Sequence, residues 1–318
     1  MISSIFLVVL GFGAVALLVT GALAPIETLS WWAGWTESEI ADEDAPVPVQ
    51  ENADRLYIVY LSGVASISGR FLIPREKAFI KNLKARFPKA KVISDVFPYS
   101  PSGLPLLESP RLFDRLWRWV QYLKLEGRTA LLAILINMRN IFQVMISADH
   151  RYGPIFNQGA AKVIEGALTR AGYARGSGAP VVIIGYSGGA QIAIGASTFL
   201  RSRLNAPIDV ISIGGVMGSD PGLQFIRRLD HIVGERDTVE RFGAAMYPER
   251  WKAMAHSDWN AAKRHGRVVL HRMRNMAHAG VKGYFGRVKV DGVSNNDRTL
   301  DEVAAILAPD APQATPPA

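Results

Sequence analysis

The sequence lacks cysteine altogether, and its first 54 residues contain neither lysine nor arginine. Without cysteine the chain forms no disulfide, carries no thiolate nucleophile and binds no metal through sulfur. A phosphate-binding loop of the form G-x-x-x-x-G-K-[ST] is also missing, as are helix-turn-helix and aromatic-basic patterns, so nucleic acid is not an expected partner. What remains is a chain of 318 residues, 49% of them hydrophobic, which predicts one large domain with an appendage.

The appendage is at the N-terminus, where residues 2–24 run without a charged side chain. A helix of this length can cross the hydrocarbon core of a bilayer, so we predict a single membrane anchor within residues 1–36. A cleaved signal peptide is the competing interpretation, because Ala22-Leu23-Ala24 has the small residues of a cleavage site. The segment lacks a basic start and Pro25 would follow the cut, so the uncleaved anchor is favoured.

Three tryptophans, Trp31, Trp32 and Trp35, follow the apolar span and either lie at the membrane interface or pack on the globular domain. Residues 37–54 are acidic and proline-bearing, which predicts a solvated tether. No basic residue flanks the span, so the positive-inside rule gives little indication of its orientation in the membrane. The free amine before the span and the acids after it favour an extracytoplasmic body, with the cytoplasmic side left open.

Charge is divided unevenly between the two parts of the chain. Residues 1–54 hold 8 acidic side chains, which leaves 36 basic and 20 acidic residues in 55–318, a formal net charge of +16. A basic body tethered to a bilayer would be attracted to anionic lipid and would enrich anionic substrates. Solubility alone is the alternative explanation of this charge.

From residue 55 the sequence alternates short apolar runs with segments of helical period. The predicted strands are 55–63, 90–98, 180–187, 207–215, 230–237 and 267–273. Helices are expected over 74–88, in the segments between the later strands, and at 297–309, before a disordered tail at 311–318. Strands that alternate with helices predict a mostly parallel sheet covered on both faces.

An insertion interrupts this alternation at about residues 103–150, between the early and the central strands. Within it, residues 129–148 are apolar apart from one helical stripe, formed by Arg139, Asn140, Gln143 and Ser147. A second membrane span would bury Arg139, so an amphipathic cap or interfacial helix is favoured. A helix packed on the sheet is the alternative.

Residues 185–189, Gly-Tyr-Ser-Gly-Gly, form a G-x-S-x-G pattern between an apolar strand and a helix. A serine hydroxyl needs a base and an oxyanion site to act as a nucleophile, and a sharp strand-to-helix turn supplies the required exposure. Gly185 and Gly189 avoid clashes across such a turn, and the Gly188 N–H would face the oxyanion. A glycine-rich packing turn or an anion cradle at the helix start is the non-catalytic alternative.

An acid and a histidine should follow Ser187 near the ends of later strands. Asp237 ends the predicted strand 230–237 and is the preferred acid, with Asp220 as the alternative and Glu235 behind both. His278 lies in a loop after the last predicted strand and completes the order Ser187, Asp237, His278. The other histidines, which precede the serine or lie in predicted strands and helices, are His150, His231, His256, His265 and His271.

In this order, these motifs resemble those of the α/β-hydrolase superfamily, from about Arg55 to Pro309. The resemblance implies an α/β-hydrolase domain over residues 55–310, with an eight-strand-like, mostly parallel sheet that lacks early strands here. It also implies a second oxyanion donor after the first strand, where Ser62-Gly63-Val64 assigns the role to the Val64 N–H, although the His-Gly pair common in the superfamily is missing.

The resemblance implies a serine esterase or lipase that needs no metal and no organic cofactor. The apolar insertion and the anchor suggest an acyl ester, thioester or lipid substrate reached at a membrane surface. A membrane-tethered α/β-hydrolase scaffold that binds anionic lipid or a protein partner without turnover is the alternative function.

Overall fold

The computed structural model describes residues 21, 23–34, 55–66, 68, 69, 72–103 and 129–308, with side chains described from 134 onward in the last range. Most of the predicted anchor, the tether at 37–54, residues 104–128 of the insertion and the tail at 311–318 lie outside the described residues. Within the described ranges, no helix is long and apolar enough to cross a membrane.

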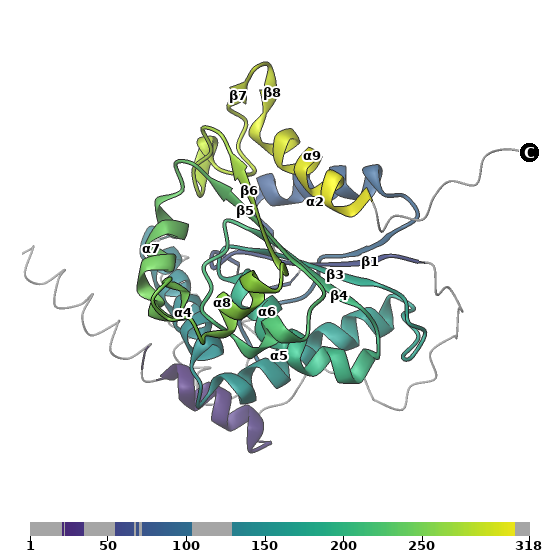
Figure 1. Ribbon diagram of the computed structural model, residues 1–318, viewed down its shortest axis with the longest axis vertical. Helices are drawn as coiled ribbons and strands as arrows, with labels where there is room; N and C mark the ends of the chain where they lie inside the picture. The colour runs from purple at the N-terminus through teal and green to yellow at the C-terminus, as the bar shows by residue number, and fades with distance from the viewer. Residues whose placement is uncertain are drawn as a thin grey trace, which may run out of the picture.

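Six strands form one wholly parallel sheet in the order β2-β1-β3-β4-β5-β6 (Figure 1). The strands are β1 Tyr57–Leu61, β2 Lys91–Ile93, β3 Val181–Tyr186, β4 Ile208–Ile213, β5 Leu229–Gly234 and β6 Val268–Met273. The predicted α/β class is therefore confirmed, with six strands in this sheet where the resemblance implied an eight-strand-like sheet that lacks early strands. β2 is shorter than its predicted range because pairing with β1 ends at Ile93.

Helices cover both faces of the sheet. On one face lie α2 Pro74–Arg86 and α9 Asn295–Leu307, and on the other α5 Gly153–Arg170 and α6 Gly189–Leu204 (Figure 1). Strand β1 has apolar side chains on both faces of the sheet, so helices must cover both. Ile58 and Tyr60 belong to one core cluster, and Val59 and Leu61 belong to the other. A strand buried on both sides reads as a continuous apolar run, which is what the sequence has there.

The remaining described elements are two helices, one longer helix in the insertion, a short hairpin and three 3-10 turns. They are α4 Thr129–Ala148, α7 Thr238–Met246, α8 Asp258–Arg264, the hairpin β7 Lys289–Val290 and β8 Val293–Ser294, and the 3-10 turns η1 Pro221–Gln224, η2 Pro248–Arg250 and η3 Gly280–Lys282. The predicted helical segments after β4 and after α7 are thus only the short η1, η2 and α8. The insertion holds α4, and α5 is the crossover helix that leads into β3.

Helix α4 has its polar stripe on the inside. Arg139, Asn140, Gln143 and Ser147 are all buried, whereas Ile134, Ile141 and Met145 are exposed. The helix packs against α5 and α6 and also contributes to the wall of a cavity. Periodicity correctly grouped the polar residues on one face, and the structure turns that face toward polar partners inside the protein.

One of those partners comes from the N-terminal region, where residues 23–32 are helical. Glu27 of this helix accepts hydrogen bonds from Arg139 and, at 3.0 Å, from Gln143 Nε2. The Lys162 ammonium lies 5.9 Å from the centre of the Trp31 ring, while Trp32 is 65% exposed. Of the two expectations for the tryptophans, packing on the domain therefore holds for Trp31; Trp35 lies outside the described residues.

Glu76 of α2 is buried near the Tyr60 hydroxyl of β1, and its titration predicts a stability that depends on pH. Burial raises the pKa of Glu76 from 4.5 to about 7, so between these values the folded state holds a proton that the unfolded chain has lost. Stability should therefore decline from about pH 4.5 to 7, by roughly 3 kcal/mol for one such group. We expect Glu76→Gln to remove this decline, measured as the free energy of unfolding in urea at pH 4.5 and 8. An equally steep decline in the variant would contradict the assignment.

Candidate active site

Ser187 occupies a sharp turn between β3 and α6. Its φ angle is 53°, a left-handed conformation that a non-glycine residue adopts only at a cost. The turn is tight, since a Cβ on Gly185 would lie 2.5 Å from the Ala190 Cα, and one on Gly189 would lie 2.7 Å from the Leu61 carbonyl oxygen. The glycines of the G-x-S-x-G pattern are thus required where the strand turns into the helix, as the sequence predicted.

The structure brings Ser187, His278 and Asp237 into one hydrogen-bonded chain. The Ser187 Oγ lies 2.9 Å from His278 Nε2, and His278 Nδ1 lies 2.9 Å from Asp237 Oδ2 and 3.1 Å from Oδ1. With the ring proton on Nδ1, that nitrogen donates to the carboxylate and Nε2 is left to accept from the serine hydroxyl. This is the arrangement in which a serine proton can pass to a histidine base.

Asp237 is held in place from three sides. It follows β5 and is the N-cap of α7, where its Oδ1 accepts from the Glu240 backbone N–H at 2.9 Å. Its Oδ2 accepts from the Tyr284 hydroxyl at 2.7 Å. Burial by itself raises the pKa of Asp237, but the hydrogen bond and charge of His278 together with these two donors hold the pKa below its usual value. The carboxylate therefore stays ionised beside the imidazole.

Two tyrosines that the sequence did not single out also contact this chain. Tyr284 links the Asp237 carboxylate to the sheet, because its hydroxyl accepts from the Gly234 N–H at 2.7 Å. Tyr186 stacks on the His278 ring at 5.5 Å between centroids and donates to the His278 carbonyl oxygen at 2.9 Å. Its position beside Ser187 in the motif was a signal for Tyr186, whereas nothing local marks Tyr284.

The alternative acids lie elsewhere. Asp220 is the N-cap of η1, where it accepts from the Gly222 N–H and from Gln191 Nε2. Glu235 accepts from the Asn275 N–H. Asp237, rather than Asp220 or Glu235, is the carboxylate bonded to His278.

A second run of serine, histidine and acid is present but is sealed from solvent. His231 lies 3.0 Å from Ser212 Oγ and 3.1 Å from Glu240 Oε1, and its side chain is completely buried. Burial lowers the pKa of His231 and keeps the ring neutral. Neither Ser212 nor His231 lines the cavity described below, so a substrate cannot reach them there. Their hydrogen bonds instead connect β4 and β5 to Glu240 in the first turn of α7.

The predicted oxyanion donors both lie next to Ser187. Gly188 is the N-cap of α6, and Val64 follows β1 in a turn where the Ser66 N–H donates to the Gly63 carbonyl. A Cβ on Gly188 would lie 3.1 Å from Val64 Cγ1, so the Val64 side chain lies against the Gly188 backbone. No cluster of three or more His, Asp or Glu side chains suited to a metal occurs among the described residues.

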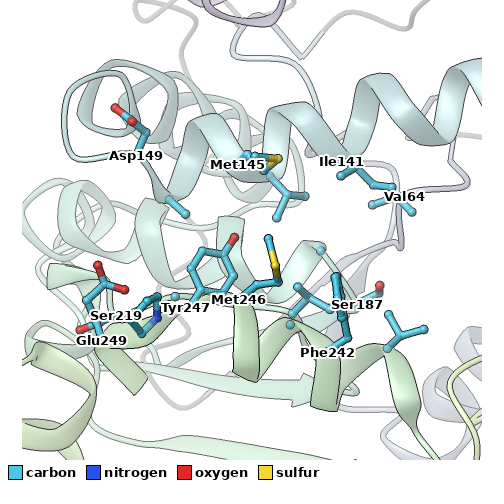
Figure 2. A pocket seen from close by; sticks show the side chains of 18 of the residues that line it. Val64, Ile141, Met145, Asp149, Ser187, Ser219, Phe242, Met246, Tyr247 and Glu249 are labelled. Carbon is cyan, nitrogen blue, oxygen red and sulfur yellow. The ribbon is translucent and has the colours of Figure 1, made fainter. Parts of the chain in front are cut away.

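Ser187 and His278 open onto a cavity of about 640 Å³ (Figure 2). Its walls come mainly from α4 and α7 and are largely apolar, with Ile141, Met145, Phe242 and Met246 facing one another across the space. Asp149, Ser219 and Glu249 lie at the end away from Ser187. The site therefore suits a substrate with a hydrocarbon part beside the serine and leaves room for polar groups further out.

Comparisons with known proteins place the chain in no described family. No family model matches the sequence, and no curated protein matches it. Among solved structures, a dienelactone hydrolase-like promiscuous phosphotriesterase from metagenomic libraries is 10% identical, with a TM-score of 0.41 over 84% of this chain and 89% of the other. A protein of Agrobacterium vitis S4, described only provisionally as a hydrolase, is 11% identical, with a TM-score of 0.35 over 85% of this chain and 98% of the other. Both likenesses are too distant to define the reaction.

Proposed function

We propose that this protein is a serine hydrolase that cleaves carboxylic esters through an acyl-enzyme on Ser187. The observation that supports it is the hydrogen-bonded chain from Ser187 Oγ through His278 to Asp237, which opens directly onto the apolar cavity. A packing turn or an anion cradle requires neither the histidine at 2.9 Å nor the buried carboxylate behind it.

In the acylation step, Ser187 Oγ attacks the ester carbonyl carbon while its proton passes to His278 Nε2. The carbonyl oxygen becomes an oxyanion, which the Gly188 and Val64 N–H groups stabilise. His278 then donates the proton to the departing alkoxide, or to a thiolate in a thioester. Asp237 orients the ring and stabilises its charged form. In the second half, His278 Nε2 takes a proton from water, whose oxygen attacks the acyl carbon. His278 then returns the proton to Ser187 Oγ as the bond between Oγ and the acyl carbon breaks, which releases the carboxylic acid and the free serine.

A fluorophosphonate probe tests this function, since it labels serines that a neighbouring base activates. We expect the folded parent protein to be labelled once, with the modified peptide containing Ser187 by mass spectrometry, and the heat-unfolded protein to remain unlabelled. Absence of labelling in folded protein, or labelling at another serine, would overturn the proposal.

The substrate we propose carries an acyl chain, because the cavity beside Ser187 is apolar. Each buried CH₂ contributes about 0.8 kcal/mol, so kcat/KM for p-nitrophenyl esters should rise from acetate to octanoate. We expect Met145→Asp, which puts a charge on the cavity wall, to lower kcat/KM for octanoate about tenfold with little effect on acetate.

Ile134→Asp is the matched control for this variant. Ile134 lies on the same helix, is 57% exposed against 50% for Met145, and does not line the cavity. It should leave both esters within about twofold of the parent. Equal rates for all chain lengths in the parent would contradict the acyl-chain assignment.

We further propose that the enzyme acts at a membrane surface, on the basis of the charge-free residues 2–24 and the basic body. Cell fractionation should recover the protein with membranes, released by detergent and retained in high salt. The alternative function, a tethered scaffold for anionic lipid or a protein partner, predicts salt-sensitive liposome binding without labelling or turnover. Labelling at Ser187 would exclude a purely non-catalytic scaffold.

A further inference from the structure

We propose that Glu27, Arg139 and Asn140 form a positioning chain that holds the Val64 loop in place as an oxyanion donor, so that the N-terminal helix is part of the catalytic body. The inference rests on the proposed function. It assigns a task to the buried stripe of α4 and to a segment that the sequence marks only as the end of an anchor.

The chain acts on the backbone carbonyls of the loop. Asn140 Nδ2 donates to the Val64 carbonyl at 2.7 Å and to the Ser66 carbonyl at 2.8 Å. The loop is also tied at Ser62, whose carbonyl accepts from the Tyr99 hydroxyl at 2.7 Å. Three carbonyls of the segment between residues 62 and 66 are therefore fixed by side chains from outside it.

These bonds hold the turn between residues 62 and 66, and that turn orients the Val64 N–H. In a planar trans peptide, the N–H points opposite to the C=O of the same unit. The Gly63 carbonyl accepts from the Ser66 N–H inside the turn, so the Val64 N–H of that peptide points away from Ser66. Val64 lines the cavity together with Ser187 and Gly188, which is where the proposed oxyanion donor has to lie.

Arg139 keeps Asn140 and Tyr99 in position. Its Nη1 donates to Asn140 Oδ1 at 2.8 Å and to the Tyr99 carbonyl at 2.8 Å. The guanidinium is buried, and a buried charge is tolerated only with a counter-charge. Glu27 supplies that charge through an ion pair with Arg139. The N-terminal helix therefore stabilises Arg139, which in turn orients the Asn140 side chain that binds the loop.

Asn140→Asp is the sharpest test, because it preserves size and the Oδ1 that accepts from Arg139 but removes both donations to the loop. Loss of one oxyanion donor costs about 10²- to 10³-fold in kcat. We expect kcat on p-nitrophenyl butyrate to fall about 100-fold with KM within about threefold. Glu27→Gln should lower kcat about tenfold, and the two effects should be less than multiplicative, since they act through one chain.

Ser147→Ala is the matched control. Ser147 belongs to the same buried stripe, but its hydroxyl donates to Asn157 Oδ1 at 2.6 Å rather than to a carbonyl of the loop. It should lower the thermal midpoint while kcat stays within about twofold of the parent. A similar loss of kcat in Ser147→Ala and Asn140→Asp would mean that any weakening of α4 suffices, and would overturn the inference.

Oxyanion positioning and general damage are separated by comparing an ester with its thionoester, in which the developing anion is a larger, weakly accepting sulfur. In Asn140→Asp the oxo-ester rate should fall far more than the thionoester rate. An equal fall in both would overturn the inference.

Hydrogen exchange of the backbone amides in residues 62–66 measures how firmly the loop is held, independently of turnover. Protection should fall in Asn140→Asp and Glu27→Gln and not in Ser147→Ala; unchanged protection in the first two would overturn the positioning chain. An active parent with unaffected Asn140→Asp kinetics refutes only this inference. A parent that neither turns over esters nor labels refutes the proposed function and the oxyanion role with it, whatever the exchange data show.

Discussion

Ser187→Ala is expected to lower kcat for p-nitrophenyl esters by about 10⁶-fold and to abolish fluorophosphonate labelling. Removing the nucleophile of a serine triad eliminates the acyl-enzyme route, and the remaining rate comes only from binding and the oxyanion donors. The side chain lost is one hydroxyl in a turn whose strained φ alanine must also adopt. The measurements are kcat by ester hydrolysis and labelling of purified protein, with the thermal midpoint as a check on folding.

Ser212→Ala is the control that the fold itself offers. Ser212 also lies 3.0 Å from a histidine, but this pair is buried and does not line the cavity. Its removal should cost stability, about 1 kcal/mol for a lost buried hydrogen bond, and leave kcat within about threefold. If Ser187→Ala retained turnover near that of Ser212→Ala, the acyl-enzyme mechanism would have to be abandoned.

Asp237→Asn is expected to lower kcat by about 10⁴-fold at neutral pH with little change in KM. The asparagine NH₂ would donate to His278 Nδ1, which forces the ring proton onto Nε2 and leaves no lone pair there for the Ser187 hydroxyl. The corresponding change in a chymotrypsin-type triad has an effect of this size. The variant should still label with fluorophosphonate, but at a rate reduced by a similar factor, which the time course of labelling measures.

Asp220→Asn separates the two acids that the sequence left open. Asp220 is buried and hydrogen-bonded like Asp237, but its partners are Gly222 and Gln191 rather than His278. Its replacement should leave kcat within a few fold of the parent. A large loss in Asp220→Asn together with an active Asp237→Asn would reverse the assignment of the acid.

Several of these assignments depend on one helix. The inner face of α4 supports the Val64 loop through Asn140, while its outer residues Ile141 and Met145 line the cavity where we propose the acyl chain binds. A change in this helix can therefore affect rate or substrate preference separately, according to the face it alters. The contrast between Asn140→Asp and Met145→Asp measures that separation directly.

The parallel α/β class and the approximate place of the strands could be predicted from the sequence, because buried parallel strands leave continuous apolar runs. The sequence also determined the turn at Ser187, since the close approach around Gly185 and Gly189 demands glycine locally. Chain order then led to Asp237 and His278, and the structure does bring both to Ser187. These features are readable because each depends on neighbours in the chain or on the regular succession of strands.

The surroundings of each helix face and side chain, by contrast, could be known only once the chain was folded. Periodicity placed Arg139, Asn140, Gln143 and Ser147 on one face of a helix, but whether that face meets water or protein depends on partners distant in sequence. Glu27, 112 positions before Arg139, is such a partner, and Tyr284, 47 positions after Asp237, is another. Nothing in the local sequence marks either contact, because a buried polar group is stabilised by whatever packing brings to it and not by its own neighbours along the chain.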